Sequence, residues 1–415
     1  MYINKIRLVN FRGMEDLTVE FAQGVNVIIG DNGAGKTSLL NGINSILKSF
    51  FSSAKIEKKD VRVSFANVGD ATQSMTYYTP TIIQAFVHLK DKECECVCSK
   101  RNESSETKNT SGFIAELLRL MENDSRHVLP LFNYQSDRRN LLLEEKMEQT
   151  PTGRIERRQG YKGAFSGIFD ANSVQKWCFQ MELNEFQQKK KFSEYENFKK
   201  NISRFIEYIE EKKVGSNVYF DSEIWSLAYF DGKSKQPLYN LSSGYQSVLC
   251  MIMELAYRAV LLNPTLDNFE TLEGIVIIDE IDMHLHPKWQ WKILDALHTT
   301  FPSIQFIVAT HSPMIISSAK GARLLRMKSP NDIEPMTSAY GYSISDVVEL
   351  RQGSTELPQL AKTLKDKLED CIDRDDLEEA QRIVQEAIEN FGEDSSPVRE
   401  MKDFLEVNKW VAEAD

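Results

Sequence analysis

The segment from Val25 to Leu47, VNVIIGDNGAGKTSLLNGINSIL, decides the fold of this chain. It opens with Val25–Ile29, a short apolar run typical of a strand buried on both faces of a sheet. Gly30–Thr37 follows and fits the pattern G-x-x-x-x-G-K-[ST] without a mismatch. From Leu39 on, apolar residues recur at helical spacing. Strand, glycine turn and helix are the context that a phosphate-binding loop needs, and they argue against a chance glycine loop.

Each part of this loop has a predicted role. The glycines let backbone N–H groups turn toward a phosphate, and the helix start adds its dipole. We expect Lys36 to reach the β- and γ-phosphates of ATP, and the Thr37 hydroxyl to coordinate Mg²⁺. The predicted nucleotide-binding residues of the loop are Asn32, Gly33, Ala34, Gly35, Lys36, Thr37 and Ser38.

Two later apolar runs end in residues suited to hydrolysis. Gly274–Ile278 delivers Asp279, placed to hold Mg²⁺ through water, and then Glu280, which can act as general base on the attacking water. The run that begins at Ile304 ends at His311, whose neutral imidazole could hydrogen-bond the γ-phosphate. A single histidine at the end of a strand is usually structural. The functional interpretation of His311 therefore depends on the phosphate-binding loop and the Asp279–Glu280 pair, which also follow apolar runs. The predicted catalytic residues are Lys36, Glu280 and His311.

A second helix start, Asn240–Ser247 (NLSSGYQS), also looks built for an anion. Ser242, Ser243 and Gly244 open an apolar helix, so free N–H groups and two hydroxyls face whatever lies there. The stretch has neither a lysine nor a magnesium ligand, so it cannot bind a nucleotide unaided. We therefore interpret it, together with Gln246, as half of a site that another copy completes; a plain helix cap is the competing interpretation.

Composition and charge narrow the function classes. The chain has 415 residues and a net charge of −11. The segment from Lys362 to the end has 8 basic and 17 acidic residues, so its net charge is −9. The acidic tail is therefore not expected to contact phosphate, whereas Arg154–Lys162 and Lys189–Lys191 are candidate DNA contacts or solvated faces. With no signal pattern at the start, no expected membrane-spanning run and no disulfide framework among six cysteines, we expect a cytoplasmic protein without a membrane partner.

The order of strand-like and helix-like segments along the chain predicts an α/β fold, that is, a mixed sheet with helices. Residues 1–135 are expected to form an ATPase lobe with the phosphate loop, and 136–240 a helical insertion lobe. Residues 241–345 then complete the ATPase head, and 346–415 form an acidic C-terminal helical region that ends in a helical hairpin. Gly392 closes the first helix of this hairpin, and Ser396 caps the second. Since no seven-residue repeat is sustained, we expect no long coiled coil.

Together, GDNGAGKT, LSSGYQS, the Asp279–Glu280 pair and the strand-end His311 resemble ATP-binding-cassette ATPases, in which two copies pack head to tail and each caps the other's nucleotide. The start INKIRLVNFRG (Ile3–Gly13) resembles the chromosome-maintenance, RecF and overcoming-lysogenisation-defect branch. That resemblance implies that Arg12 lies near the nucleotide, that Gln135 joins the magnesium site, and that Asp282 communicates across the dimer. After Ala319 we find no acidic constellation for a topoisomerase-primase nuclease domain.

IIDEIDMHLHPKWQWKIL (residues 277–294) and FPSIQFIVATHSPMIISS (residues 301–318) resemble compact bacterial defence ATPases, in particular the PtuA type of the Septu anti-phage system and its retron-associated relatives. This resemblance implies ATP and Mg²⁺ as cofactors, a homodimer that can build a higher oligomer such as a hexamer, and a small HNH nuclease, PtuB, as partner. The alternative is a DNA-repair ATPase clamp of the RecF and chromosome-maintenance kind. A transporter motor is disfavoured by the long insertion.

Overall fold

Strands from distant parts of the chain build the central sheet of this computed structural model. The structure describes residues 1–51, 80–89, 92–100, 108–110, 127–137, 156–211, 215–349, 359–374, 376–393 and 395–414. The chain divides into two compact units, Met1–Val347 and Val348–Asp415. The first and third segments predicted from the sequence share the central sheet and so belong to the same unit.

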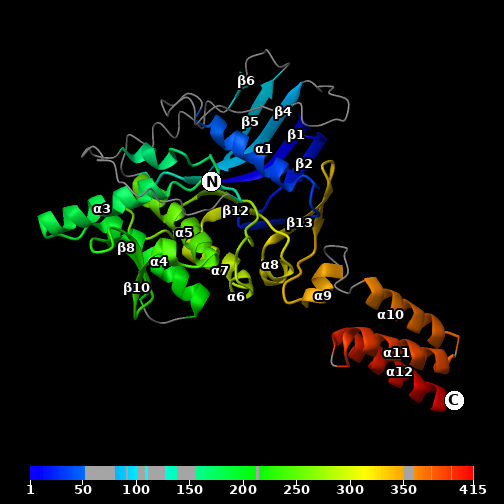
Figure 1. The fold of residues 1–415 in the computed structure, drawn as a ribbon. Coiled ribbons are helices and arrows are strands. Elements are labelled where there is room, and N and C mark those ends of the chain that lie inside the picture. Colours follow the sequence, from blue (N-terminus) through cyan, green and yellow to red (C-terminus); the bar gives the residue numbers. More distant parts are fainter. Residues whose placement is uncertain are drawn as a thin grey trace. The chain divides into compact units, whose positions relative to one another are not determined.

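The central sheet has six strands in the order β14-β13-β3-β12-β11-β7. Its strands are β3 (Val25–Ile29), β7 (Leu131–Gln135), β11 (Gly274–Ile278), β12 (Ile304–Ala309), β13 (Arg323–Ser329) and β14 (Asp332–Met336). The five from β13 to β7 run parallel, and β14 pairs antiparallel at one edge. All residues of β7, β11 and β12 are buried, which explains the continuous apolar run of β11 and the mostly apolar sequences of β7 and β12. Figure 1 labels β12 and β13, which lie on either side of β3 in the strand order.

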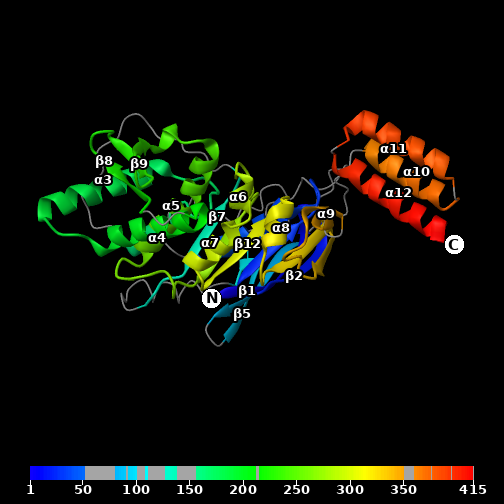
Figure 2. The ribbon, with the colours of Figure 1, turned by 90° about the horizontal axis from the view of Figure 1, so that it is seen from below.

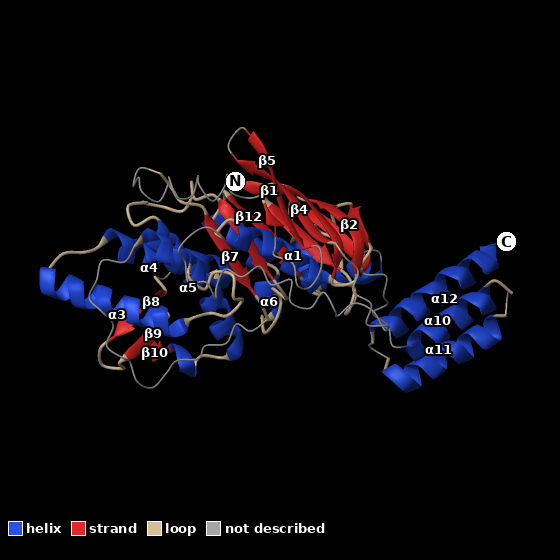
Figure 3. Cartoon of the chain, turned by 90° about the horizontal axis from the view of Figure 1, so that it is seen from above, coloured by secondary structure: helices blue, strands red, loops and turns tan. Residues whose placement is uncertain are grey.

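A second sheet, antiparallel, covers the first helix. Its order is β2-β1-β4-β5-β6, built from β1 (Tyr2–Phe11), β2 (Met14–Glu20), β4 (Thr81–Leu89), β5 (Lys92–Lys100) and β6 (Lys108–Asn109). Helix α1 (Lys36–Ser49) packs against β1, β4 and β5 on one side and contacts β12 on the other; Figure 3 shows it beside these strands. Since α1 is mostly buried between the two sheets, the glycine loop that precedes it has little freedom to shift.

The insertion lobe contains strands as well as helices (Figure 2). Its described elements are the 3₁₀ helix η1 (Arg157–Tyr161), α3 (Ala171–Gln188), α4 (Ser193–Glu210), β8 (Asn217–Asp221), β9 (Ser226–Phe230), β10 (Lys235–Pro237) and the 3₁₀ helix η2 (Leu238–Asn240). The prediction of a helical lobe is therefore incomplete: β10-β9-β8 form a small antiparallel sheet. These strands are too short to show a clear alternation, and Val218 and Phe220 are nevertheless buried.

Helix α5 (Ser243–Leu262) runs through the core of the larger unit. By length and composition alone, this helix could cross a membrane, although Glu254 and Arg258 interrupt its apolar sequence. However, 83% of its most apolar window is buried inside the fold, as in the core helix of a globular unit. The remaining helices of the unit are α6 (Pro287–Gln290), α7 (Ile293–Thr300), α8 (Pro313–Ser318) and α9 (Ile344–Val347).

The C-terminal unit is a three-helix arrangement of α10 (Gln359–Ile372), α11 (Leu377–Phe391) and α12 (Ser396–Ala414). The predicted hairpin corresponds to α11 and α12, with Gly392 at a left-handed φ of 81° directly after α11. Helix α10 adds Leu364 and Leu368 to the apolar residues that α11 and α12 bury between them. The third helix is needed because two amphipathic helices alone leave part of that apolar surface exposed to water.

Candidate functional site

Four neighbouring parallel strands bring their carboxyl ends to one edge of the central sheet. Strand β3 leads into the glycine loop, β12 into His311, β11 into Asp279 and Glu280, and β7 ends at Gln135. The order β3-β12-β11-β7 thus places side by side four segments that are far apart in the sequence. Ligands of open α/β sheets bind at this edge, and the residues predicted to bind phosphate and magnesium meet there.

Lys36 is almost fully buried at the start of α1. Its Nζ atom donates hydrogen bonds to the carbonyl oxygens of Gly30 at 3.0 Å and Asp31 at 3.1 Å, and lies 2.6 Å from Nε2 of His311. An ammonium group can share this contact only with an unprotonated ring nitrogen. Burial and the charge of Lys36 both lower the pKa of His311, which favours that neutral imidazole.

The glycine loop has the backbone conformation that its sequence pattern requires. Gly33 and Gly35 have φ values of 83° and 105°, a left-handed region that other residues rarely adopt. Asn32, Gly33 and Thr37 are exposed, Ser38 is half-buried, and the Ala34 side chain is buried. The polar residues of the loop therefore face solvent, whereas the Ala34 side chain packs into the core.

Asp279, Thr37 and Gln135, the predicted magnesium ligands, come from the ends of the neighbouring strands β11 and β7 and from the start of α1. Burial raises the pKa of Asp279, and a hydrogen bond with the Thr37 side chain acts in the opposite direction. The Asp279 backbone N–H donates to the Gln135 carbonyl at 2.8 Å. The Nε2 atom of Gln135 donates to the Met251 carbonyl at 3.2 Å, while its buried Oε1 atom has no hydrogen-bond partner among the described residues. A carboxylate, a hydroxyl and an orphaned amide oxygen are the donor set that Mg²⁺ prefers, so the predicted ligands fit this ion.

Glu280 has strained backbone geometry, with φ of 46°. Its Oε1 atom lies 3.7 Å from Nε2 of His311. Burial raises the pKa of Glu280, and the charges of Asp282 and Asp279 add to this effect. A raised pKa makes a carboxylate a better proton acceptor near neutral pH.

Asp282 is held within its own subunit. Its Oδ1 atom accepts hydrogen bonds from the Thr310 hydroxyl and, at 3.4 Å, from the backbone N–H of His311. Asp282 therefore fixes the backbone that carries His311, in addition to any contact across a dimer. Sequence reasoning missed Thr310, although a polar residue directly after the apolar run Ile304–Ala309 and before His311 was an available signal.

Arg12 occupies the turn between β1 and β2, with φ of 48°. Its guanidinium carbon is 5.7 Å from the centre of the Phe11 ring. Its charge lowers the pKa of the Tyr134 hydroxyl, against the larger effect of burial, which raises it. Arg12 is therefore within electrostatic reach of the end of β7, next to Gln135. The sequence analysis did not name Tyr134 as a residue close to Arg12 and Asp279.

The serine-glycine helix start forms a separate cluster. Ser242 and Ser243 are exposed, and the Ser242 side chain does not cap α5. Gly244 packs so closely on the turn after β11 that a Cβ atom would lie 2.7 Å from the His284 carbonyl oxygen. The Gln246 amide donates to the carbonyls of Tyr239 and Leu241 at 3.1 and 2.8 Å, so it braces the turn before the helix.

The basic segment that was a candidate DNA contact is only partly available. Arg154 and residue 155 lie outside the described residues. Arg157 turns inward: it donates to the Leu262 carbonyl at the end of α5 and to the His127 carbonyl, both at 2.6 Å. Arg158 pairs with Glu156 at 2.9 Å. Arg157 therefore has a structural role, which weakens the prediction that this segment contacts DNA.

The glycine loop with its lysine, the Asp279–Glu280 pair and His311 at one sheet edge, together with the serine-glycine start of α5, define an ATPase of the ATP-binding-cassette type. The RecF/RecN/SMC N terminal domain family model matches residues 2–334, and the chain belongs to this family.

Two curated relatives and one solved structure show what the chain is similar to. The Retron Vc95 probable ATPase of Vibrio cholerae is 25% identical over 80% of this chain and 75% of its own length. The Septu protein PtuA of Bacillus thuringiensis is 25% identical over 80% of this chain and 78% of its own length. A structure of the SmcHead bound to the C-winged helix domain of ScpA has 15% identity and a TM-score of 0.51, covering 81% of this chain and 98% of that one. It supports the fold alone.

Proposed function

We propose that this chain is the ATPase of a bacterial anti-phage defence system, which pairs head to tail with a second copy when it binds ATP and regulates an associated nuclease. The observation that carries the head-to-tail arrangement is the presence of two incomplete anion sites. One has Lys36 and the predicted magnesium ligands Asp279, Thr37 and Gln135; the other has exposed Ser242 and Ser243 at an uncapped helix start. The names of the retron and Septu relatives support the defence role.

In the proposed reaction, the loop amides and Lys36 bind the phosphates, and the partner copy's Ser243 helix start caps the γ-phosphate. Thr37 and Asp279, with Gln135, would hold Mg²⁺, which would neutralise phosphate charge. Glu280 takes a proton from the attacking water, and its raised pKa suits this role. His311, neutral beside Lys36, donates a hydrogen bond to a γ-phosphate oxygen. Asp282 and Thr310 keep the His311 backbone in position.

The shared site can be tested by mixing two inactive variants. Ser243→Arg puts a bulky side chain on an exposed residue and avoids the cis contact of Gly244 with His284. Alone, it should bind ATP normally but hydrolyse it about 10²-fold more slowly, because stabilisation of the transition state is lost. Lys36→Ala should also be inactive alone. An equimolar mixture should recover roughly a quarter of wild-type turnover, since half of random dimers are mixed and each has one intact site of two.

A mixture as inactive as its components would contradict the head-to-tail arrangement. So would a Ser243→Arg protein with wild-type turnover. Ser193→Arg, a matched change at the exposed first residue of α4, is the control for the added side chain.

The defence role predicts a partner encoded nearby. Co-expression with the neighbouring open reading frame should co-purify a small HNH nuclease of the PtuB kind, and the pair should restrict phage growth. We expect Lys36→Ala to abolish this protection, because the nuclease would no longer be under nucleotide control. Failure to co-purify a partner, together with unchanged phage growth, would count against the defence proposal but leave the ATPase assignment intact.

The family model also includes RecF, so a DNA-repair clamp is the second candidate. It requires that the protein alone bind DNA in an ATP-dependent and steeply salt-sensitive manner. The inward orientation of Arg157 removes one of the cations this would use. An affinity for DNA that falls steeply with salt, without any partner protein, would favour the clamp over the defence ATPase.

A further inference from the structure

An ion pair is buried in the middle of α5, far along the helix from Ser243. Glu254 and Arg258 lie one turn apart, and each is about 5% exposed. The Nε and Nη2 atoms of Arg258 donate to Oε1 of Glu254 at 3.1 and 2.9 Å. Burying two charges costs free energy that their attraction often fails to offset, so an apolar pair would serve stability at least as well. This pair therefore needs a reason beyond stability.

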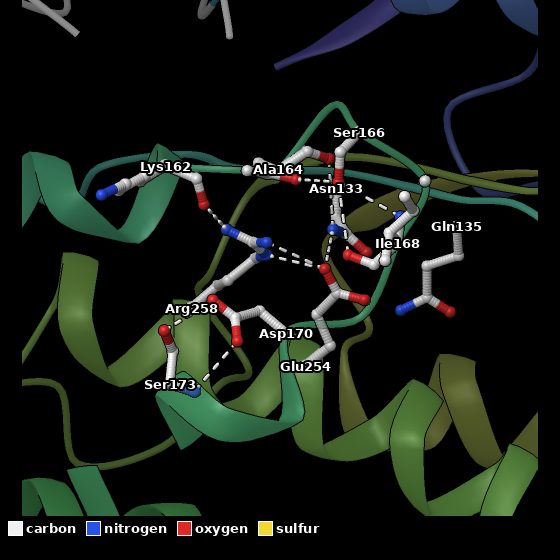
Figure 4. Close-up of polar contacts among 12 residues, drawn as sticks. Asn133, Gln135, Lys162, Ala164, Ser166, Ile168, Asp170, Ser173, Glu254 and Arg258 are labelled. Atoms are coloured by element: carbon white, nitrogen blue, oxygen red, sulfur yellow. Dashed lines mark hydrogen bonds and ion pairs between the residues drawn. The ribbon is translucent and has the colours of Figure 1, made fainter. Parts of the chain in front are cut away.

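The same pair is bonded to two other segments of the chain. Nη1 of Arg258 donates to the carbonyl oxygens of Gly160 at 2.9 Å and Lys162 at 2.7 Å. On the other side, Nδ2 of Asn133, in β7, donates to Oε1 of Glu254 at 2.9 Å. Figure 4 shows the Arg258 guanidinium and the Asn133 amide converging on the Glu254 carboxylate from two different elements. One carboxylate oxygen thus accepts from both β7 and α5.

The segment after η1 closes this arrangement. The Ala164 carbonyl accepts from Nδ2 of Asn133 at 3.3 Å and from the Tyr134 backbone N–H at 2.8 Å. Gly160 approaches α5 so closely that a Cβ atom there would lie 2.6 Å from Cγ of Leu262. Helix α5, strand β7 and residues 160–164 are therefore locked together by directional bonds and have little room to slide.

Along α5, Met251 and its bond to Gln135 lie between this junction and Ser243. In the proposed dimer, Gln135 and Ser243 of one copy belong to two different ATP sites. Two residues beyond Asn133, Gln135 contributes an orphaned oxygen to the predicted magnesium ligands and bonds to Met251 of α5. At the other end of α5, Ser243 faces the partner copy in the proposed dimer. The relative placement of Gln135 and Ser243 thus depends on how α5 is held against β7.

We infer that Glu254, Arg258 and Asn133 are positioning residues, which fix the signature helix α5 against β7 so that Ser243 and Gln135 keep the alignment needed for hydrolysis. This inference rests on the proposed function. For a purely structural role, it would be enough that each buried polar group has a hydrogen-bond partner. A positioning role also requires that these hydrogen bonds hold α5 in one orientation against β7. Apolar replacements remove these directional bonds, and they also take one partner each from the carbonyls of Gly160 and Lys162 and from Nδ2 of Asn133, so thermal stability is measured beside kcat.

Two variants separate these roles. Glu254→Met/Arg258→Met removes both charges but keeps a similar volume. Arg258→Lys keeps the charge, but an ammonium group cannot reproduce the planar fork that reaches Glu254, Gly160 and Lys162 together. We expect both proteins to fold and to bind ATP with wild-type KM, while kcat falls about tenfold, equivalent to about 1.4 kcal/mol in the barrier. Arg204→Lys, on the exposed face of α4, is the matched control and should keep wild-type kcat.

Wild-type kcat in the folded double variant would overturn this inference. If the double variant fails to fold, Arg258→Lys decides the matter, and an unchanged kcat there has the same consequence. A fall in thermal stability with kcat retained would also overturn it, since that is the result of a structural role. Absence of ATP hydrolysis in the wild-type protein would contradict the proposed function itself. The results above would contradict only the positioning role, so the two failures can be told apart.

Discussion

Glu280→Gln is expected to lower kcat for ATP hydrolysis by about 10²- to 10⁴-fold, the usual contribution of a general base, while ATP still binds. The amide has the size of the carboxylate but cannot take a proton from water. Since hydrolysis is what releases the proposed dimer, ATP should trap the variant as a dimer that elutes earlier in size-exclusion chromatography. A Glu280→Gln protein that remains monomeric and fully active would refute the assignment of the base.

Two controls sharpen this experiment. Glu334→Gln, in the edge strand β14, also removes a carboxylate and should leave both kcat and the elution volume unchanged. Combining Glu280→Gln with Ser243→Arg should abolish the trapped dimer, because the second half-site is blocked. A double variant that still dimerises with ATP would show that the dimer does not depend on the serine-glycine helix start.

The same substitution has a pH signature in stability. Burial and two neighbouring carboxylates raise the folded-state pKa of Glu280 above its ordinary value of 4.5. The folded protein therefore binds this proton more tightly than the unfolded chain does. The resulting stabilisation is fully present below pH 4.5 and is lost as the pH rises through the raised pKa. At neutral pH, Glu280→Gln should consequently raise the Tm, and the difference from wild type should disappear as the pH approaches 4.5.

Lys36→Ala should weaken ATP binding by about 10- to 100-fold, since it removes charge-assisted hydrogen bonds to phosphate worth about 1.5–3 kcal/mol. The structure adds a second reason. The Lys36 ammonium lowers the pKa of both Asp279 and Glu280, so its loss leaves these carboxylates closer to protonation and less able to serve the reaction. Hydrolysis should therefore fall further than binding.

Isothermal titration with ATP and Mg²⁺, followed by a phosphate-release assay, measures both effects. Lys48→Ala is the matched control, because Lys48 lies in the last turn of the same helix, away from the glycine loop. An ATP affinity within twofold of wild type in Lys36→Ala would contradict the assignment of the loop. An equal loss in Lys48→Ala would attribute the effect to the helix rather than to the ammonium group.

Much of this protein is determined locally and could be predicted. Val25–Ile29 is apolar except for Asn26 because the strand is buried, and Gly33 and Gly35 are glycines because the loop needs left-handed φ values. The amphipathic face of α11 and the stop at Gly392 are likewise encoded within a few neighbouring residues. Short-range periodicity missed elements that are brief, as in the sheet β10-β9-β8.

The sequence by itself determined which residues stand at strand ends and helix starts, since glycine conformation, apolar spacing and capping chemistry act over a few residues. Only the tertiary structure decided which of them meet. The strand order β3-β12-β11-β7 sets His311 against Lys36, and the turn after β11 returns Asp282 to Thr310. The bonds from Glu254 and Arg258 to β7 and to residues 160–162 follow from the way α5 packs. Such contacts join segments more than a hundred residues apart in places, and their partners depend on sheet order and register, which no local pattern encodes.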